Sequence, residues 1–131
     1  MSMNIRVVTP TSNFMIEGVS QVHLRTIEGD ITILPKHYPL ISAIDVSKVI
    51  LKKGKEEQVA FASNGIMNVK EDELVLVLNA FEFQEDIDLN RAEKSKERAL
   101  ERINSNDERF DMVRAEASLK RALMRISIVN N

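Results

Sequence analysis

The sequence predicts an N-terminal antiparallel β-sandwich followed by a C-terminal antiparallel two-helix hairpin, and three observations support this fold class. Up to about residue 83 the chain consists of short β-type runs, several with period-two alternation, which turn signals separate. After Gln84 the composition changes to the strong helix formers Ala, Glu, Lys, Arg and Leu, and neither Gly nor Pro occurs from Ile66 onward. A polar break at residues 104–107 divides the helical part into two segments.

Length and composition allow one small domain with a helical appendage. The chain has 131 residues, of which 44% are hydrophobic, and this is enough for one ordinary core but excludes two large domains. We therefore expect two domains, a β-sandwich over residues 1–84 and a helical hairpin over residues 85–131.

The first part is expected to form a series of short strands. Turn signals at 28–30, 53–55 and 64–65 stand where the chain must reverse. Because the runs are too closely spaced for intervening helices, they favour two antiparallel sheets packed face to face over a parallel sheet. The expected strands are Ile5–Thr9, Phe14–Glu17, Ser20–Thr26, Asp30–Leu34, Leu40–Ile44, Lys48–Lys52, Glu57–Ser63, Ile66–Lys70 and Glu73–Phe83.

The second part is expected to form two helices. The first helix is predicted to begin near residues 86–88, whose carboxylates can cap free backbone amides, and to end near Asn104. The second is predicted to run from about Asp107 to Val129. Because the break between them is short, the second helix must return antiparallel to the first.

The two predicted helices are copies of one another. Residues 91–103 match residues 114–126 with an offset of 114 − 91 = 23, and nine of the thirteen positions are identical. Two copies are too few for a solenoid, which needs about three repeats, so we interpret them as a duplicated helix in a hairpin. In each copy the arginines fall at i, i+7 and i+11, which gives Arg91, Arg98 and Arg102 in the first and Arg114, Arg121 and Arg125 in the second.

Arg121 and Arg125 have no acidic residue three or four positions away in their own helix. The two arginines lie one helical turn apart, and like charges at that spacing repel each other unless an anion compensates. Three interpretations remain open: a solvated basic face, an acidic surface on a partner chain, and a phosphate group, which the planar guanidinium pairs with bidentately.

Several function classes are excluded by what the sequence lacks. There is no cysteine, and the two histidines, His23 and His37, lack the spacing of a metal site. A Gly-rich phosphate loop and a nucleophile elbow are also missing, so we do not expect an enzyme. The net charge of -2 argues against nucleic-acid binding. Without a long apolar run or a secretory signal, we expect no direct membrane insertion.

Four segments resemble the epsilon subunits of bacterial F-type ATP synthases. Residues 28–40, Glu-Gly-Asp-Ile-Thr-Ile-Leu-Pro-Lys-His-Tyr-Pro-Leu, are similar to the family signature Glu-Gly-Asp/Glu…Leu-Pro-x-His-x-Pro-Leu. Residues 7–10 (Val-Val-Thr-Pro), 62–69 (Ala-Ser-Asn-Gly-Ile-Met-Asn-Val) and 86–92 (Asp-Ile-Asp-Leu-Asn-Arg-Ala) also fit the family. The resemblance covers essentially the whole chain, and the family's fold is the one predicted above.

The resemblance implies a non-catalytic rotor subunit in the central stalk of a proton- or sodium-translocating ATP synthase, peripheral to the cytoplasmic face of the cell membrane. It implies that the sandwich binds the gamma subunit and the c-ring, with Asp30 and His37 at the c-ring contact. It also implies that the hairpin inhibits ATP hydrolysis when it extends along gamma to the alpha and beta subunits.

The resemblance further implies a regulatory ATP site in the folded hairpin, and no cofactor is required. Some bacterial members bind ATP through an Ile-Asp-x-x-Arg-Ala motif, and residues 87–92 match that motif. The implied ATP-binding residues are Glu82, Ile87, Asp88, Arg91, Ala92, Arg98, Arg121 and Arg125.

The chain departs from the family pattern at several positions. Lys36 stands where glycine is usual, Asn64 replaces the first glycine of a pair, and Asn68 replaces a glutamate. Phe81 and Phe83 replace small or polar residues in the linker, where such large side chains are expected to pin the hairpin to the sandwich. The alternative function is a free-standing nucleotide-sensing or adaptor module outside a rotary enzyme.

Overall fold

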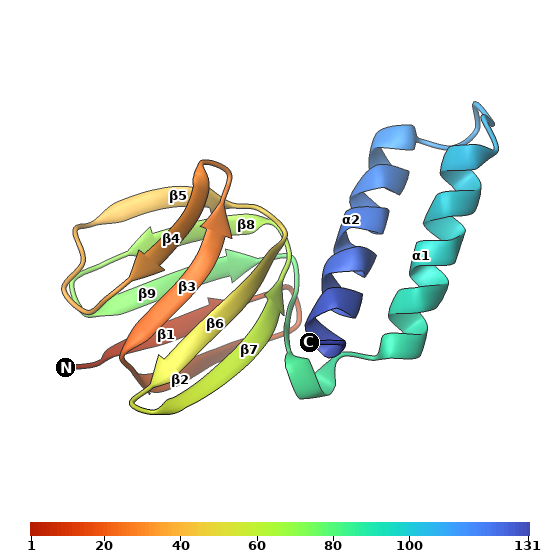
Figure 1. Ribbon diagram of the computed structural model, residues 1–131. Helices are drawn as coiled ribbons and strands as arrows, with labels where there is room; N and C mark the ends of the chain where they lie inside the picture. Colours follow the sequence, from red (N-terminus) through yellow and green to blue (C-terminus); the bar gives the residue numbers. More distant parts are fainter. The chain divides into compact units, whose positions relative to one another are not determined.

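The computed structural model describes residues 1–131 and confirms a β-sandwich followed by two helices (Figure 1). The chain divides into two compact units, Met1–Gln84 and Glu85–Asn131. The strands are β1 (Met3–Val8), β2 (Asn13–Val19), β3 (Gln21–Thr26), β4 (Gly29–Ile33), β5 (Leu40–Ile44), β6 (Ser47–Lys53), β7 (Glu56–Ala62), β8 (Gly65–Val69), β9 (Glu73–Leu78) and β10 (Phe81–Phe83). A short 3-10 turn (Gln84–Asp86) precedes the helices α1 (Leu89–Asn104) and α2 (Met112–Val129).

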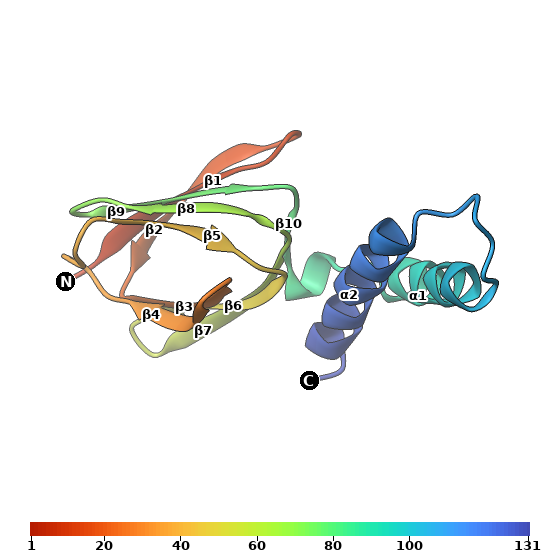
Figure 2. The ribbon, with the colours of Figure 1, turned by 90° about the horizontal axis from the view of Figure 1, so that it is seen from above.

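The strands of the first unit form one continuous ladder folded into two layers. The strand order is β10-β7-β6-β3-β5-β8-β9-β1-β2, and β4 pairs with β3. Figure 2 shows β1, β5, β8 and β9 in one layer and β3, β4, β6 and β7 in the other. The ladder passes from one layer to the other through a single pair, Thr26 with Ile44.

One strand pair differs from the expected antiparallel arrangement. β1 runs parallel to β9, with Ile5 opposite Leu74, whereas the other pairs are antiparallel. Parallel pairing needs a long connection. β2 to β8 lie between these two strands in the chain and provide it, so the prediction of purely antiparallel sheets is wrong at this position.

Apolar side chains fill the space between the two layers. Burial alternates along the strands, as in Met3, Ile5 and Val7 of β1, because successive side chains point to opposite faces. Each such side chain contributes about 1.5–3 kcal/mol when fully buried. The core includes Ile5, Val7, Val22, Leu24, Val49, Leu51, Leu74 and Leu76, all at most 1% exposed.

The last predicted strand, Glu73–Phe83, is in fact two strands in two different pairings. β9 pairs with β8 and β1, whereas β10 pairs with β7. The chain bends at Asn79 and Ala80, where the Asn79 backbone N–H donates to the Asn64 carbonyl (3.0 Å) and the Ala80 carbonyl accepts from the Ser63 N–H (3.0 Å). These bonds to the neighbouring loop hold the bend without a glycine or proline.

Three phenylalanine rings close the sandwich at the two ends of the strand order. The Phe14 ring of β2 lies 5.9 Å from that of Phe81 and 6.4 Å from that of Phe83, both on β10, and the latter two centroids are 5.3 Å apart. Tilted and edge-to-face ring contacts of this kind stabilise by about 0.5–1.5 kcal/mol beyond area burial. The two linker aromatics therefore pack within the sandwich unit itself.

Each helix of the second unit begins at an aspartate cap. The Asp88 carboxylate accepts from the Arg91 backbone N–H, and the Asp111 carboxylate accepts from that of Arg114, both at 3.1 Å. The predicted start of the first helix is confirmed, but the second begins five residues later than predicted. Asp107 does not cap it, because its carboxylate accepts from the backbone and guanidinium of Arg109 and holds a turn instead.

Candidate functional sites

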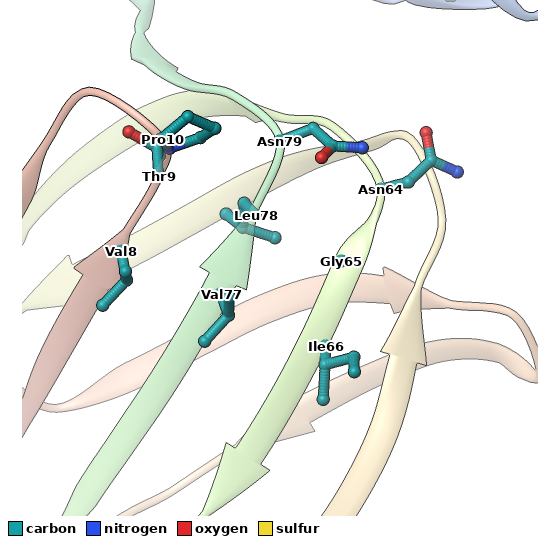
Figure 3. Close-up of a pocket in the computed structure, with 9 residues that line it drawn as sticks. All are labelled: Val8, Thr9, Pro10, Asn64, Gly65, Ile66, Val77, Leu78 and Asn79. Carbon is teal, nitrogen blue, oxygen red and sulfur yellow. The ribbon is translucent and has the colours of Figure 1, made fainter.

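An apolar row crosses the outer face of the β1, β9 and β8 layer. Val8 lies opposite Val77, and Val77 lies opposite Ile66, so the three side chains are neighbours across the sheet (Figure 3). Val77 is 50% and Ile66 53% exposed. The outer face of a sandwich is ordinarily polar, so this apolar row is a candidate interaction surface.

This row forms the floor of a shallow groove of about 550 Å³. Thr9, Asn64 and Asn79 provide polar side chains at its rim, and Pro10, Gly65 and Leu78 complete its lining (Figure 3). Sequence reasoning missed the groove. The signal was the uninterrupted apolar run of residues 74–78, in which every second residue, here Val75 and Val77, has to face outward.

The predicted c-ring residues lie on and beside β4. The exposed Asp30, on β4, accepts from Arg25 Nε at 3.2 Å, and one of its carboxylate oxygens lies 4.0 Å from His23 Nε2. His37 lies in the loop after β4, with Nδ1 2.8 Å from the Tyr38 carbonyl oxygen. The same loop exposes 85% of Tyr38.

The turn before His37 contains a strained residue. Lys36 has a φ of 64°, in the left-handed region that favours glycine. The family pattern that the sequence resembles has glycine at this position, and a left-handed φ is a physical reason for that expectation. Asn64, which also stands where the family pattern has glycine, does not have a positive φ. The turn at Asn64 therefore does not require a left-handed residue.

The predicted ATP-binding residues are spread over both units. Glu82 lies on β10 of the first unit, and the other seven belong to the second. Ala92 is buried at 3% exposure, and Asp88 is the α1 cap described above. The Arg98 guanidinium donates to the Ser95 hydroxyl and that of Arg121 to the Ser118 hydroxyl, both at 3.2 Å.

Arg121 also lines a polar hollow of about 520 Å³ at the loop end of the hairpin. The end of α1, the loop and α2 as far as Arg121 contribute side chains to it. Arg102 Cζ lies 5.5 Å from the centre of the Phe110 ring, within range of a cation–π contact. The hollow is lined by Arg102, Arg109, Phe110, Asp111, Arg114, Ala115, Ser118 and Arg121.

Arg109, which lines this hollow, pairs with Asp107; the Arg109 side chain is 85% exposed and that of Asp107 26%. The hydrogen bonds that Arg109 donates lower the pKa of the Asp107 carboxyl below its ordinary value, and the same bonds raise the pKa of Arg109. Because the folded-state pKa of Asp107 is depressed, its small contribution to stability is present above the unfolded-state pKa and is lost as pH falls through the folded one.

Arg109→Ala is therefore expected to raise the pKa of Asp107 towards the ordinary value of an aspartate. The hydrogen bonds from the Arg109 side chain disappear, and the one from its backbone N–H weakens. Side-chain carboxyl signals followed by NMR across an acid titration measure this. Lys120→Ala removes one positive charge elsewhere on α2 and serves as the control. An unchanged Asp107 pKa in Arg109→Ala would contradict the assignment.

No group of three or more His, Cys, Asp or Glu side chains is placed to hold a metal ion. No helix is both long and apolar enough to cross a lipid bilayer.

Family models divide the chain at the same point as its fold. The β-sandwich domain of the ATP synthase delta/epsilon chain matches residues 2–84, and the long α-helix domain of that chain matches residues 85–130. The chain belongs to the ATP synthase delta/epsilon family. Membership confirms the prediction of a non-catalytic epsilon chain of an ATP synthase.

Relatives of this family cover most of the chain. The ATP synthase epsilon chain of Alkalihalophilus pseudofirmus is 39% identical over 107 residues, 82% of this chain and 80% of the relative. That of Halalkalibacterium halodurans is 37% identical over 102 residues, 78% and 77% of the two chains. A chain in the Euglena gracilis mitochondrial ATP synthase shares the fold, with a TM-score of 0.80 at 17% identity over 94% of this chain and 78% of that one.

Proposed function

We propose that this family member works in the central stalk of a proton- or sodium-translocating F-type ATP synthase, at the cytoplasmic face of the cell membrane. Its sandwich binds the gamma subunit and the c-ring, and its hairpin regulates ATP hydrolysis. The observation that carries the proposal is the apolar row of Val8, Val77 and Ile66, in which Val77 and Ile66 are half exposed, on a domain of this family.

The gamma subunit is assigned to the groove that contains this row. Its apolar floor and its polar rim of Thr9, Asn64 and Asn79 have the anatomy of a protein interface. The row is built from the sandwich alone and lies on strands with a complete core beneath them. The gamma contact therefore does not need the hairpin.

The c-ring is assigned to β4 and the loop after it. Asp30 at the start of β4 and His37 in the loop supply polar groups, and Leu34 (51% exposed) and Tyr38 (85%) supply exposed apolar surface. This combination suits the short polar loops of a membrane ring. The loop joins β4 to β5, whereas the apolar row lies on β1, β9 and β8. The two contacts therefore use separate parts of the sandwich.

Residues 1–84 alone are expected to fold and to bind gamma, because their core is contained within the first unit. Val77→Asp is expected to weaken this binding about a hundredfold, since it places a charge at the centre of the apolar floor. Co-purification and titration with isolated gamma measure both results.

Ile27→Asp is the matched control, because Ile27 is also an exposed apolar residue (68%, against 50% for Val77) but lies in the turn between β3 and β4. Circular dichroism verifies that each variant is folded. If folded residues 1–84 do not bind gamma, the assignment of the gamma contact to the sandwich is wrong.

Inhibition of hydrolysis is assigned to the basic end of α2. Lys120, Arg121 and Arg125 lie there, and no acidic side chain follows Glu116. An extended hairpin would bring these charges to acidic surfaces of the alpha and beta subunits.

ATP is assigned to the folded hairpin as a regulatory ligand, with no cofactor required. Ile87, Asp88 and Ala92 hold the base, and Arg91, Arg121 and Arg125 hold the phosphates. Glu82 and Arg98 are the accompanying residues. One Asp88 oxygen is used by the α1 cap, and the other can accept from an adenine amino group. Binding stabilises the folded hairpin as RT ln(1 + [L]/Kd) and so opposes the inhibitory form.

Calorimetric titration of the full chain with ATP is expected to show binding that Arg91→Ala and Arg125→Ala each weaken about tenfold or more, because a charge-assisted hydrogen bond is lost. Arg25→Ala, which removes a guanidinium from the sandwich, is expected to leave binding unchanged. Equal affinity in all four proteins would show that the site is elsewhere.

A further inference from the structure

We propose that the loop end of the hairpin holds a second site, for a nucleoside polyphosphate, in the hollow that Arg102, Phe110, Arg114 and Arg121 line. The ligand class follows from the side chains of this hollow. Arg121 is also assigned to the first ATP site, and the comparison between the two sites rests on the proposed function.

The internal repeat extends further towards the N-terminus than the helices themselves. The offset of 23 that relates the two arginine sets also takes Asp88 to Asp111 and Ala92 to Ala115. At the first position of the motif, the same offset relates Ile87 to Phe110, so the residue type differs there. The sequence Ile-Asp-x-x-Arg-Ala at 87–92 thus has a second copy, Phe-Asp-x-x-Arg-Ala, at 110–115.

The two copies have the same local geometry. Each aspartate caps its helix by accepting from the backbone N–H of the arginine three residues later, at 3.1 Å in both. In each copy the second arginine donates to a serine hydroxyl three residues earlier, at 3.2 Å in both. Both motif alanines are 3% exposed. The duplication therefore preserves structure as well as sequence.

The hollow combines the second copy with the end of the first. Phe110, Asp111, Arg114 and Arg121 come from the second copy, and Arg102 comes from the end of α1. Arg102 is the counterpart of Arg125, since 102 + 23 = 125. An antiparallel pair of copies places the start of each helix beside the end of the other. The hollow is consequently the counterpart, at the loop end, of the site proposed at the start of α1.

The charges around this hollow favour a multiply charged anion. Arg109 is neutralised by its short pair with Asp107 (2.6 Å). The other lining residues carry three guanidiniums, those of Arg102, Arg114 and Arg121, and one carboxylate, that of Asp111. A di- or triphosphate can accept from several of these planar donors at once and relieve their mutual repulsion.

The hollow also has groups that suit a nucleobase. Phe110 is 37% exposed, and an aromatic ring offers a stacking surface for a base. One Asp111 oxygen is engaged by the α2 cap, which leaves the other to accept from an exocyclic amino group. The volume of about 520 Å³ lies in the range of small-molecule sites. A purine nucleotide that carries an amino group fits these features together.

Amide chemical shifts of the full chain, titrated with ATP, test the proposal. In Arg91→Ala, which disables the first site, the amides of residues 110–115 are expected to shift still. In Arg114→Ala these shifts are expected to require about tenfold more ATP or more. Phe110→Ala is expected to weaken the binding of ATP but not that of inorganic triphosphate, which has no base to stack on the ring.

The two sites fail separately in this experiment. Shifts confined to residues 87–92 in every protein would overturn the second site and leave the first intact. Shifts confined to residues 110–115 would support the second site and remove the first. If Phe110→Ala binds ATP as tightly as the unaltered chain, the nucleoside assignment is wrong, and equal binding by Arg114→Ala overturns the site altogether.

Discussion

Gly65→Ala is expected to destabilise the sandwich by about 3 kcal/mol, because the new methyl group would overlap backbone that cannot move aside. A Cβ at this position would lie 2.0 Å from the Val77 carbonyl oxygen and 2.8 Å from Leu78 Cα. Gly65 is paired on both sides, with Leu78 of β9 and Ile44 of β5. Moving the backbone aside to relieve this overlap would break the pairing of β8 with β9 or β5 in the centre of the layer.

Urea denaturation of the full chain measures this loss, followed by a probe of the sandwich. Gly54→Ala is the matched control, because its Cβ would meet no atom within 4 Å, although its φ of 62° is left-handed. That conformation alone costs an alanine about 1 kcal/mol. If the two variants unfold at the same urea concentration, close approach of the β8 and β9 backbones is not the reason for a glycine at position 65.

Gly65 also lines the proposed gamma groove, so Gly65→Ala is expected to weaken gamma binding as well.

The triple variant Lys120→Ala, Arg121→Ala and Arg125→Ala is expected to relieve inhibition of ATP hydrolysis. Each lost charge weakens docking to an acidic surface by about 1 kcal/mol, or about 3 kcal/mol together. This corresponds to an inhibitory affinity lower by on the order of a hundredfold. Hydrolysis by a membrane-free catalytic complex, titrated with the chain, measures it.

The direction of this change separates docking from nucleotide sensing. If the same arginines acted only by holding ATP in the folded hairpin, their loss would favour the extended form and strengthen inhibition. Lys48→Ala, Lys53→Ala and Lys55→Ala together remove the same charge from the sandwich and serve as the control. Unchanged inhibition by the α2 triple variant would refute the electrostatic account.

The sequence specified most strands because their signals are local. Alternating burial and turn residues such as Gly54 are properties of a few neighbouring residues. The bend at Asn79 and Ala80 lacks such a signal, because hydrogen bonds to the loop at residues 63–64 hold it. The parallel pairing of β1 with β9 is likewise a choice between segments far apart in the chain.

The helix boundaries show the same division at a finer scale. Asp88 was predicted as part of the first helix start, and it is the cap. For the second helix, Asp107 and Asp111 have the same capping chemistry, and composition cannot choose between them. Arg109 decides the matter by binding the Asp107 carboxylate, which leaves the capping role to Asp111.

The sequence by itself determined the duplicated helix and the spacing of its arginines, because both are repeats along one chain. Only the tertiary structure decided which arginines share a hollow. Arg102 comes from the first copy and Arg114 and Arg121 from the second, and they meet because antiparallel packing sets the start of α2 beside the end of α1. Repulsion among like charges brought together in this way is a property of the packed hairpin, and it is the physical reason to expect an anion there.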